Sequence, residues 1–246
     1  MDRNPFVILG RCFTSGAVIR ICRHLLVSGT VLLASFSALP QDVALQEKFA
    51  ATKQAAAESQ QKLRQYQWIE TTQVTLKGDQ KPATKNLCRY GPDGQVQKTA
   101  IGAPPQQPSG GRVKQRIVEK KKAEMTDYME DVKGILAMYV PPDSQRMQQA
   151  YQAGNVALNP IPGAVNLVFT NYAQQGDKMT LRFDTTAKKI TMLAIETYMG
   201  QAKDKVTLKV QMGSLPDGTN YPQRTVLSAS AKDLTVTTTN SDYQRL

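Results

Sequence analysis

Residues 164–240 alternate between apolar and polar side chains, and this period-two pattern constrains the fold more than any other feature. In VTLKVQM (206–212) every second residue is apolar, and VNLVF (165–169) and MTLRF (179–183) repeat apolar residues at the same period. Short turn-forming stretches separate the runs, at 174–177, 184–189, 200–205 and 215–220. The pattern predicts strands with one face toward water, joined as an antiparallel meander.

One run in this region departs from strict alternation. The segment KITMLAIETYM (189–199) carries apolar residues at both parities. This favours a central strand that is covered on both faces. Segments 222–231 and 232–240 complete the predicted meander.

The first half of the chain mixes helical and extended patterns. YQWIETTQVTLK (66–77) reads as a strand, and NLCRY (86–90) and QVQKTAI (95–101) flank GPDG as a hairpin. Helical spacing appears over 42–66, 112–140 and 143–155, with Asp143 as the cap of the last segment. The order predicts an α+β fold: a strongly curved antiparallel sheet, or half-barrel, with an N-terminal helix and an inserted helical hairpin on one face. Residues 38–246 are expected to form this single domain, with a mobile Pro/Gly loop at 102–111.

The N-terminal stretch resembles an export signal. An apolar run over residues 25–38 follows four arginines, and it is too short for a typical membrane-spanning helix. Small residues at Ser35 and Ser37 predict a signal peptide over residues 1–37, cleaved after Ser37, which places the protein in the periplasm or outside the cell. The alternative is that the segment stays attached as a membrane anchor.

Cleavage would remove most of the chain's reactive side chains. His24 is the only histidine, and Cys12 and Cys22 also lie in the predicted signal, so that Cys88 alone would remain. A Ser-His-Asp or Cys-His site needs an imidazole, and a zinc site usually needs several His and Cys ligands. The sequence therefore predicts a protein that is not an enzyme and that holds no cofactor or metal. A hydrolase that uses carboxylates such as Asp127 or Glu196 is a further alternative.

Apolar residues on the predicted strands are candidates to line a ligand groove between the sheet and the helices. Each has an alternative interpretation as an ordinary core residue. The candidates are Trp68, Val74, Leu76, Phe169, Leu181, Phe183, Leu208 and Val210.

A basic cluster opens the predicted helix at 112–140. Basic residues near a helix N-terminus oppose the helix dipole, so either the helix begins nearer Glu119 or the cluster serves an anionic partner, for which a membrane surface fits an exported protein. The alternative is a solvated basic segment, and no nucleic-acid motif is present, so no nucleic-acid partner is expected. The cluster consists of Arg112, Lys114, Arg116, Lys120, Lys121 and Lys122.

The order of elements over residues 42–240 resembles the lipoprotein-carrier (LolA-like) half-barrel group. The resemblance lies in the strand start YQWIETTQVTLKG, the inserted helices, and the strand pair MTLRFDTTAKKITMLAIETYMG. YVPPD, SLPDGTNYPQ and TTTNSDY also resemble pieces of uncharacterised exported bacterial proteins. Membership of the carrier group would imply an apolar cavity between sheet and helices that carries acyl chains.

Together these patterns lead to two functional expectations. The first is an exported, non-enzymatic binding protein that holds a lipid or a lipidated partner in an apolar groove. The second is a ligand-free structural or protein-interaction domain of the cell envelope.

Overall fold

The computed structural model describes residues 54, 57–102 and 112–246. All of these belong to one compact unit, Leu39–Leu246. The predicted signal peptide, most of the predicted first helix and the loop at 103–111 lie outside the described residues. No helix within the described part of the chain is long and apolar enough to cross a membrane.

The elements follow the order strands, helices, strands. Residues 57–63 are helical and lead into the first strand. The labelled elements are β1 (Tyr66–Leu76), β2 (Asp79–Gln80), β3 (Thr84–Tyr90), β4 (Val96–Ile101), α2 (Arg112–Leu136), α3 (Ser144–Gln152), β5 (Val156–Ile161), β6 (Ala164–Thr170), β7 (Lys178–Asp184), β8 (Lys189–Tyr198), β9 (Lys205–Ser214), β10 (Asn220–Ala229), the short η1 (Ser230–Lys232) and β11 (Leu234–Arg245).

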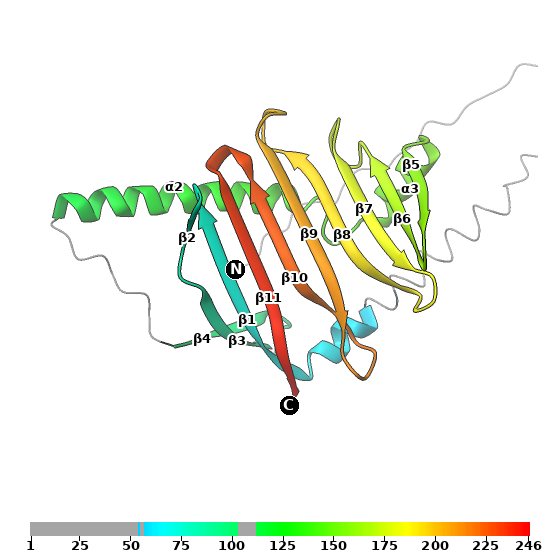
Figure 1. The fold of residues 1–246 in the computed structure, drawn as a ribbon, viewed down its shortest axis with the longest axis horizontal. Coiled ribbons are helices and arrows are strands. Elements are labelled where there is room, and N and C mark those ends of the chain that lie inside the picture. The colour runs from blue at the N-terminus through cyan, green and yellow to red at the C-terminus, as the bar shows by residue number, and fades with distance from the viewer. Residues whose placement is uncertain (1–53, 55–56, 103–111) are drawn as a thin grey trace, which may run out of the picture. The chain divides into compact units, whose positions relative to one another are not determined.

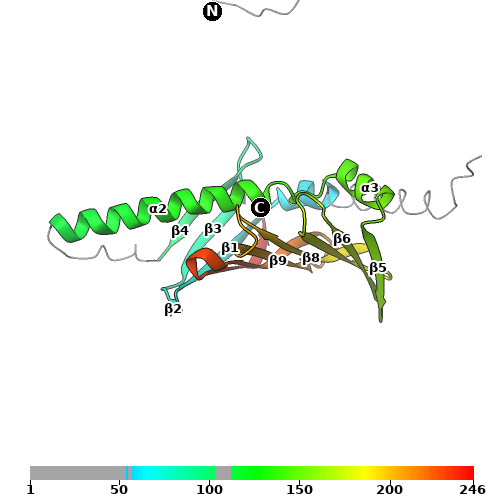
Figure 2. The same cartoon turned by 90° about the horizontal axis from the view of Figure 1, so that it is seen from above.

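These strands form one antiparallel sheet that does not close into a barrel. The spatial order is β4-β3-β1-β11-β10-β9-β8-β7-β6-β5, and β2 pairs with the end of β1. Strands β5 to β11 are a simple meander, and the last strand returns to lie beside the first (Figure 1). The helices lie on one face of the curved sheet, as Figure 2 shows. We call this face the inner face and the opposite face the outer face.

Local sequence patterns account for most of these elements. The strand predicted over 66–77 is β1, and the predicted hairpin is β3 and β4, which pair directly. Asp143 caps α3 as expected, since its side chain accepts a hydrogen bond from the backbone nitrogen of Arg146 at 2.9 Å. The α+β fold class with an inserted helical hairpin is therefore confirmed.

Two expectations were wrong. β5 (Val156–Ile161) was not predicted, because Asn159 and Pro160 make this stretch resemble a loop, whereas an edge strand tolerates proline. β8 is not covered on both faces: Leu193 and Ile195 are buried on the inner face, but Met192 and Ala194 are only half-buried on the outer face. On the outer face Met192 and Ala194 lie between polar cross-strand partners, among them Arg182 and Lys209, and not beneath a second covering layer.

Two apolar clusters fix the helices to the inner face. The first joins Tyr139 and α3 to β6, β7 and β8. The second joins Tyr128 and Val132 of α2 to the ends of β9, β10 and β11. Burial of these aromatic and branched side chains is the main favourable contribution to docking the helices.

Candidate functional site

The predicted lining residues lie on the inner face. Phe169 and Leu181 are buried in the cluster beneath α3, and Phe183, Leu208 and Val210 pack against that cluster. Val74 and Leu76 pack against the cluster beneath α2, whereas Trp68 lies in a separate aromatic cluster at the other end of β1. The structure therefore distributes the eight residues over three packed regions.

Strand register aligns a row of side chains across nine strands of the inner face. Adjacent members are direct cross-strand partners, and we call this set the boundary row. It changes from aliphatic residues on β5 to β9 to threonine on β10, β11, β1 and β3. In spatial order it consists of Leu158, Leu167, Leu181, Leu193, Val210, Thr225, Thr238, Thr72 and Thr84.

The aliphatic half of the boundary row is mostly covered by helices. Leu167, Leu181 and Leu193 are buried beneath Tyr139 and Met147. The row opens to solvent at the edge strand, where Leu158 is 56% exposed. Five strands at a spacing of about 4.8 Å give this half a width of about 19 Å. The acyl chains of one bilayer leaflet span about 15 Å, so this width suits one chain.

The threonine half is less covered and has a polar neighbourhood. Thr72, Thr225 and Thr238 are half-buried. One row further along β1, Glu70 lies opposite asparagines on both neighbouring strands. The two carboxylate oxygens of Glu70 accept hydrogen bonds from Lys98 Nζ at 2.7 and 2.8 Å. Hydroxyl, carboxylate, amide and ammonium groups thus share one region of the inner face.

Beyond Glu70 the inner face ends in an aromatic cluster. Trp68 stacks on Tyr243 with ring centroids 5.6 Å apart, and it also meets Tyr90 at 5.6 Å. Tyr221 meets Tyr243 at 4.4 Å. Burial, with the neighbouring Tyr221 as a smaller cause, raises the pKa of Tyr243 above its ordinary value. Since neighbouring rings are in contact, the cluster is a packed minor core and not an open cage.

Two buried polar atoms near Glu70 have no hydrogen-bond partner within the described part of the chain. They are Trp68 Nε1 and Asn240 Oδ1. A buried donor or acceptor without a partner costs about 1–3 kcal/mol. Burial, and then the nearby Glu70, raises the pKa of the Cys88 thiol, which is fully buried beside them. The polar part of the inner face is therefore not internally satisfied.

A buried carboxylate anchors the link between α2 and α3 to the sheet. Asp177 Oδ2 accepts a hydrogen bond from the Tyr139 hydroxyl at 2.6 Å. The backbone nitrogens of Tyr172, Ala173 and Gln174 also donate to this carboxylate. Burial, followed by the hydrogen bond to Asp177, raises the pKa of Tyr139. The sequence showed only a turn at 174–177, and nothing local to it indicates a partner 38 residues earlier.

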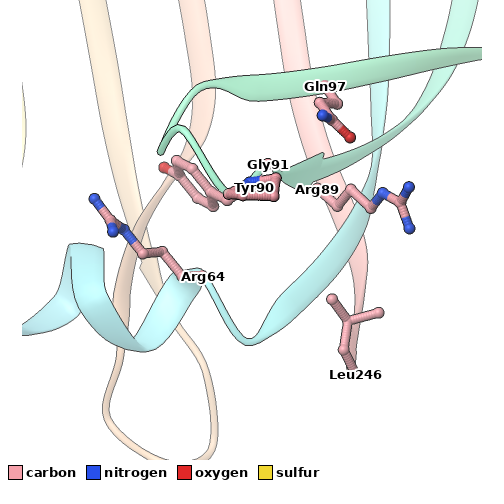
Figure 3. Close-up of a pocket in the computed structure, with 7 residues that line it drawn as sticks. Arg64, Arg89, Tyr90, Gly91, Gln97 and Leu246 are labelled. Atoms are coloured by element: carbon pink, nitrogen blue, oxygen red, sulfur yellow. The ribbon is translucent and has the colours of Figure 1, made fainter.

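A cleft of about 370 Å³ lies at the tip of the β3–β4 hairpin (Figure 3). It contains none of the predicted site residues. Arg64 and Arg89 extend to opposite sides of Tyr90, so their guanidinium groups do not converge on one anion. The lining residues are Arg64, Arg89, Tyr90, Gly91, Pro92, Gln97 and Leu246.

The carboxylates considered for hydrolysis are not brought together. Asp127 is exposed on α2. Glu196 is exposed on the outer face of β8 and pairs with Lys178 Nζ at 2.6 Å. Among the described residues there is no group of three or more His, Cys, Asp or Glu side chains that would hold a metal ion.

The predicted basic cluster lies on the first half of α2. Arg116, Lys120, Lys121 and Lys122 are exposed there. Arg112 and Lys114 belong to the same helix, but their side chains lie outside the described ones.

No protein-family model and no curated protein matches the chain. Solved structures similar to it share 10% sequence identity with it. A LolA superfamily protein from Nitrosomonas europaea has a TM-score of 0.36, over 79% of this chain and 93% of that one. A DUF1329 family protein from Desulfovibrio piger also has a TM-score of 0.36, over 80% and 92%. An outer membrane lipoprotein-sorting protein domain from Vibrio parahaemolyticus has 0.32, over 82% and 90%.

The lipoprotein-carrier group that the sequence resembles thus also appears among the similar solved structures. At these TM-scores the likeness carries no argument about a ligand or a partner. The fold class rests on the strands and helices of this chain itself: an open antiparallel half-barrel with helices on one face.

Proposed function

We propose that the protein is an exported, non-enzymatic binding protein that holds a lipid or a lipidated partner along the boundary row. The observation that carries this proposal is the change from leucine and valine to threonine halfway along one unbroken cross-strand row. An acyl chain would lie on the aliphatic half. The polar end of the ligand would lie near the threonines and the Glu70–Lys98 pair.

The physical basis is the burial of methylene groups against aliphatic side chains. Each buried methylene contributes about 0.8 kcal/mol, so a chain that covers the aliphatic half gains enough to offset the loss of its freedom. The partly exposed threonine hydroxyls provide hydrogen bonds for an ester, amide or hydroxyl group.

Ligand entry requires α3 to move, because α3 now covers the aliphatic half. Only Met147 and Ala150 of α3 are buried, so little apolar surface is exposed when it moves. The Tyr172 hydroxyl holds the start of the helix: it accepts from the backbone nitrogen of Asp143 at 2.7 Å and donates to its carbonyl oxygen at 3.3 Å. Tyr172→Phe removes this tether and keeps the ring, so we expect faster lipid uptake.

The role of the boundary is tested by shifting it one strand in either direction. Val210 and Thr225 are cross-strand partners on either side of it, and valine and threonine have nearly the same shape. Val210→Thr should weaken binding of long acyl chains about fourfold, the equivalent of one methylene, and Thr225→Val should strengthen it similarly. Val226→Thr, on the outer face of β10, is the matched control.

The assay is displacement of an environment-sensitive fluorescent fatty acid by lysophospholipids of graded chain length. Opposite shifts for the two inner-face variants, with no shift for the control, would support the proposal. Equal affinities for all four proteins would refute it.

A ligand-free interaction domain of the cell envelope is the second candidate. The observation that favours it is the burial of the predicted lining residues, since Trp68 is only 6% exposed and Phe169 is fully buried. In that case none of the variants takes up lipid.

A further inference from the structure

The side of α2 that packs on the sheet is used along only half of the helix. Met125, Tyr128 and Val132 pack into the cluster beneath α2. The same helical stripe continues backwards at four-residue spacing through Lys121 and Ile117. Both are exposed, and Ile117 is 52% exposed. Residues 112–124 therefore form a helical segment whose packing stripe is uncovered, and we call it the overhang.

The overhang extends past the strands. In both views the start of α2 projects beyond β1 and β2 (Figures 1 and 2). Its 13 residues, at 1.5 Å each, give a length of about 20 Å. Helices in proteins are stabilised mainly by packing one face against another surface. The overhang packs against no described surface, so a binding partner would stabilise it.

The charges of the overhang indicate the chemistry of that partner. Four exposed basic residues, Arg116 and the three lysines at 120–122, form no ion pair with a described carboxylate. The first turn of α2 contains no acidic residue. The first turn also carries Arg112 and Lys114, whose charges oppose the positive end of the helix dipole, and a bound anionic surface would offset that cost.

We propose that the overhang docks on an anionic lipid membrane surface. The lysine and arginine heads lie among lipid phosphates, and Ile117 enters the boundary between headgroups and acyl chains. A basic residue near an anionic membrane raises binding about fivefold, so four of them raise it by two to three orders of magnitude. An exposed isoleucine among lysines favours a lipid surface over a polyanion without an apolar phase. The inference does not depend on a ligand at the boundary row.

The test is co-sedimentation of the full chain with extruded vesicles of phosphatidylcholine, with and without phosphatidylglycerol. The N-terminal residues 1–38 are the same in all variants, so the measured quantity is the change that each variant makes in the ratio of the two affinities. We expect strong preference for anionic vesicles, which decreases as salt is raised. The triple variant Lys120→Gln, Lys121→Gln, Lys122→Gln should reduce this ratio about 100-fold.

A matched control separates docking from net charge. Lys203, Lys205 and Lys209 are three exposed lysines around β9, and replacing them with glutamine removes the same charge. The control should change the ratio less than threefold. An equal decrease of the affinity ratio in the two triple variants, or no preference of the original chain for anionic vesicles, would overturn the proposal.

Ile117→Ser distinguishes a lipid surface from another polyanion. It should weaken binding to anionic vesicles several-fold and leave binding to heparin unchanged. If vesicle binding is insensitive to Ile117 while heparin binds as tightly as vesicles, the partner is a polyanion other than a membrane and the proposal is wrong. Unchanged circular dichroism and thermal midpoints verify that each variant is folded.

Discussion

Two tyrosines of the α2 region provide a sharp test of what holds the helices to the sheet. The Tyr139 hydroxyl donates to the buried Asp177 carboxylate at 2.6 Å and also lies 2.8 Å from Thr197 Oγ1. The Tyr128 hydroxyl is buried without any hydrogen-bond partner among the described residues. Tyr139→Phe and Tyr128→Phe each remove one buried oxygen, so they differ chiefly in the hydrogen bonds that Tyr139→Phe alone loses, to Asp177 and to Thr197.

The expected magnitudes follow from this difference. A hydrogen bond to a charged group contributes about 1.5–3 kcal/mol, so Tyr139→Phe should lower the free energy of unfolding by that amount. Tyr128→Phe removes an unsatisfied group, so its effect should be close to zero or stabilising. Asp177→Asn should lower the free energy of unfolding by more, about 3–5 kcal/mol. The amide nitrogen would face a backbone donor, and the other three hydrogen bonds would no longer have a charged acceptor.

The assay is urea unfolding followed by far-UV circular dichroism and by the fluorescence of the single tryptophan. Coincident transitions would justify a two-state analysis. If the two Tyr→Phe variants lose the same stability, Asp177 does not anchor the link between α2 and α3, and the reasoning fails.

Three further predictions concern packing and pH. Gly213→Ala should destabilise the protein by about 1–3 kcal/mol, because the added Cβ would lie 2.8 Å from Tyr221 Cζ; an unchanged urea midpoint would count against this packing. Burial raises the pKa of Tyr139 and of Tyr243 above 10.0, so the protein should lose stability as pH rises above about 10. The free energy of unfolding, measured at alkaline pH, should decrease less steeply in Tyr139→Phe. Hydrogen bonds from Thr219, and then from a tyrosine hydroxyl, lower the pKa of Asp217 from 3.8 to about 2. The contribution of this carboxylate to the free energy of unfolding should therefore be lost as pH falls through that range. Unfolding measurements on Asp217→Asn should lack this part of the pH dependence.

Local patterns were sufficient to predict most of the fold. Alternation identified β1, β6, β7 and β9, the apolar run at 189–199 identified β8, and the Pro-Asp-Gly turn identified the hairpin of β3 and β4. The helix predicted over 112–140 ends at Leu136, and the turn that follows places the Tyr139 hydroxyl against Asp177. β5 was missed because its stability comes from pairing with β6 and not from its own residues.

The candidate site could be predicted only in part, for a physical reason. Parity along a strand tells which residues share a face, and this located the lining candidates on the inner face. The alignment of residues between strands depends on register, which irregularities shift next to Ile69, Phe183 and Arg224. The change from leucine and valine to threonine therefore becomes visible only after nine strands are aligned.

The central claim is that the inner face holds a lipid, and native mass spectrometry tests it most directly. The full chain would be produced in a bacterium that exports it to the periplasm, purified without detergent, and extracted with organic solvent for lipid identification. The account predicts one acyl lipid bound per chain. A measured mass equal to that of the polypeptide alone, together with no uptake of supplied fatty acids or lipopeptides, would contradict the account.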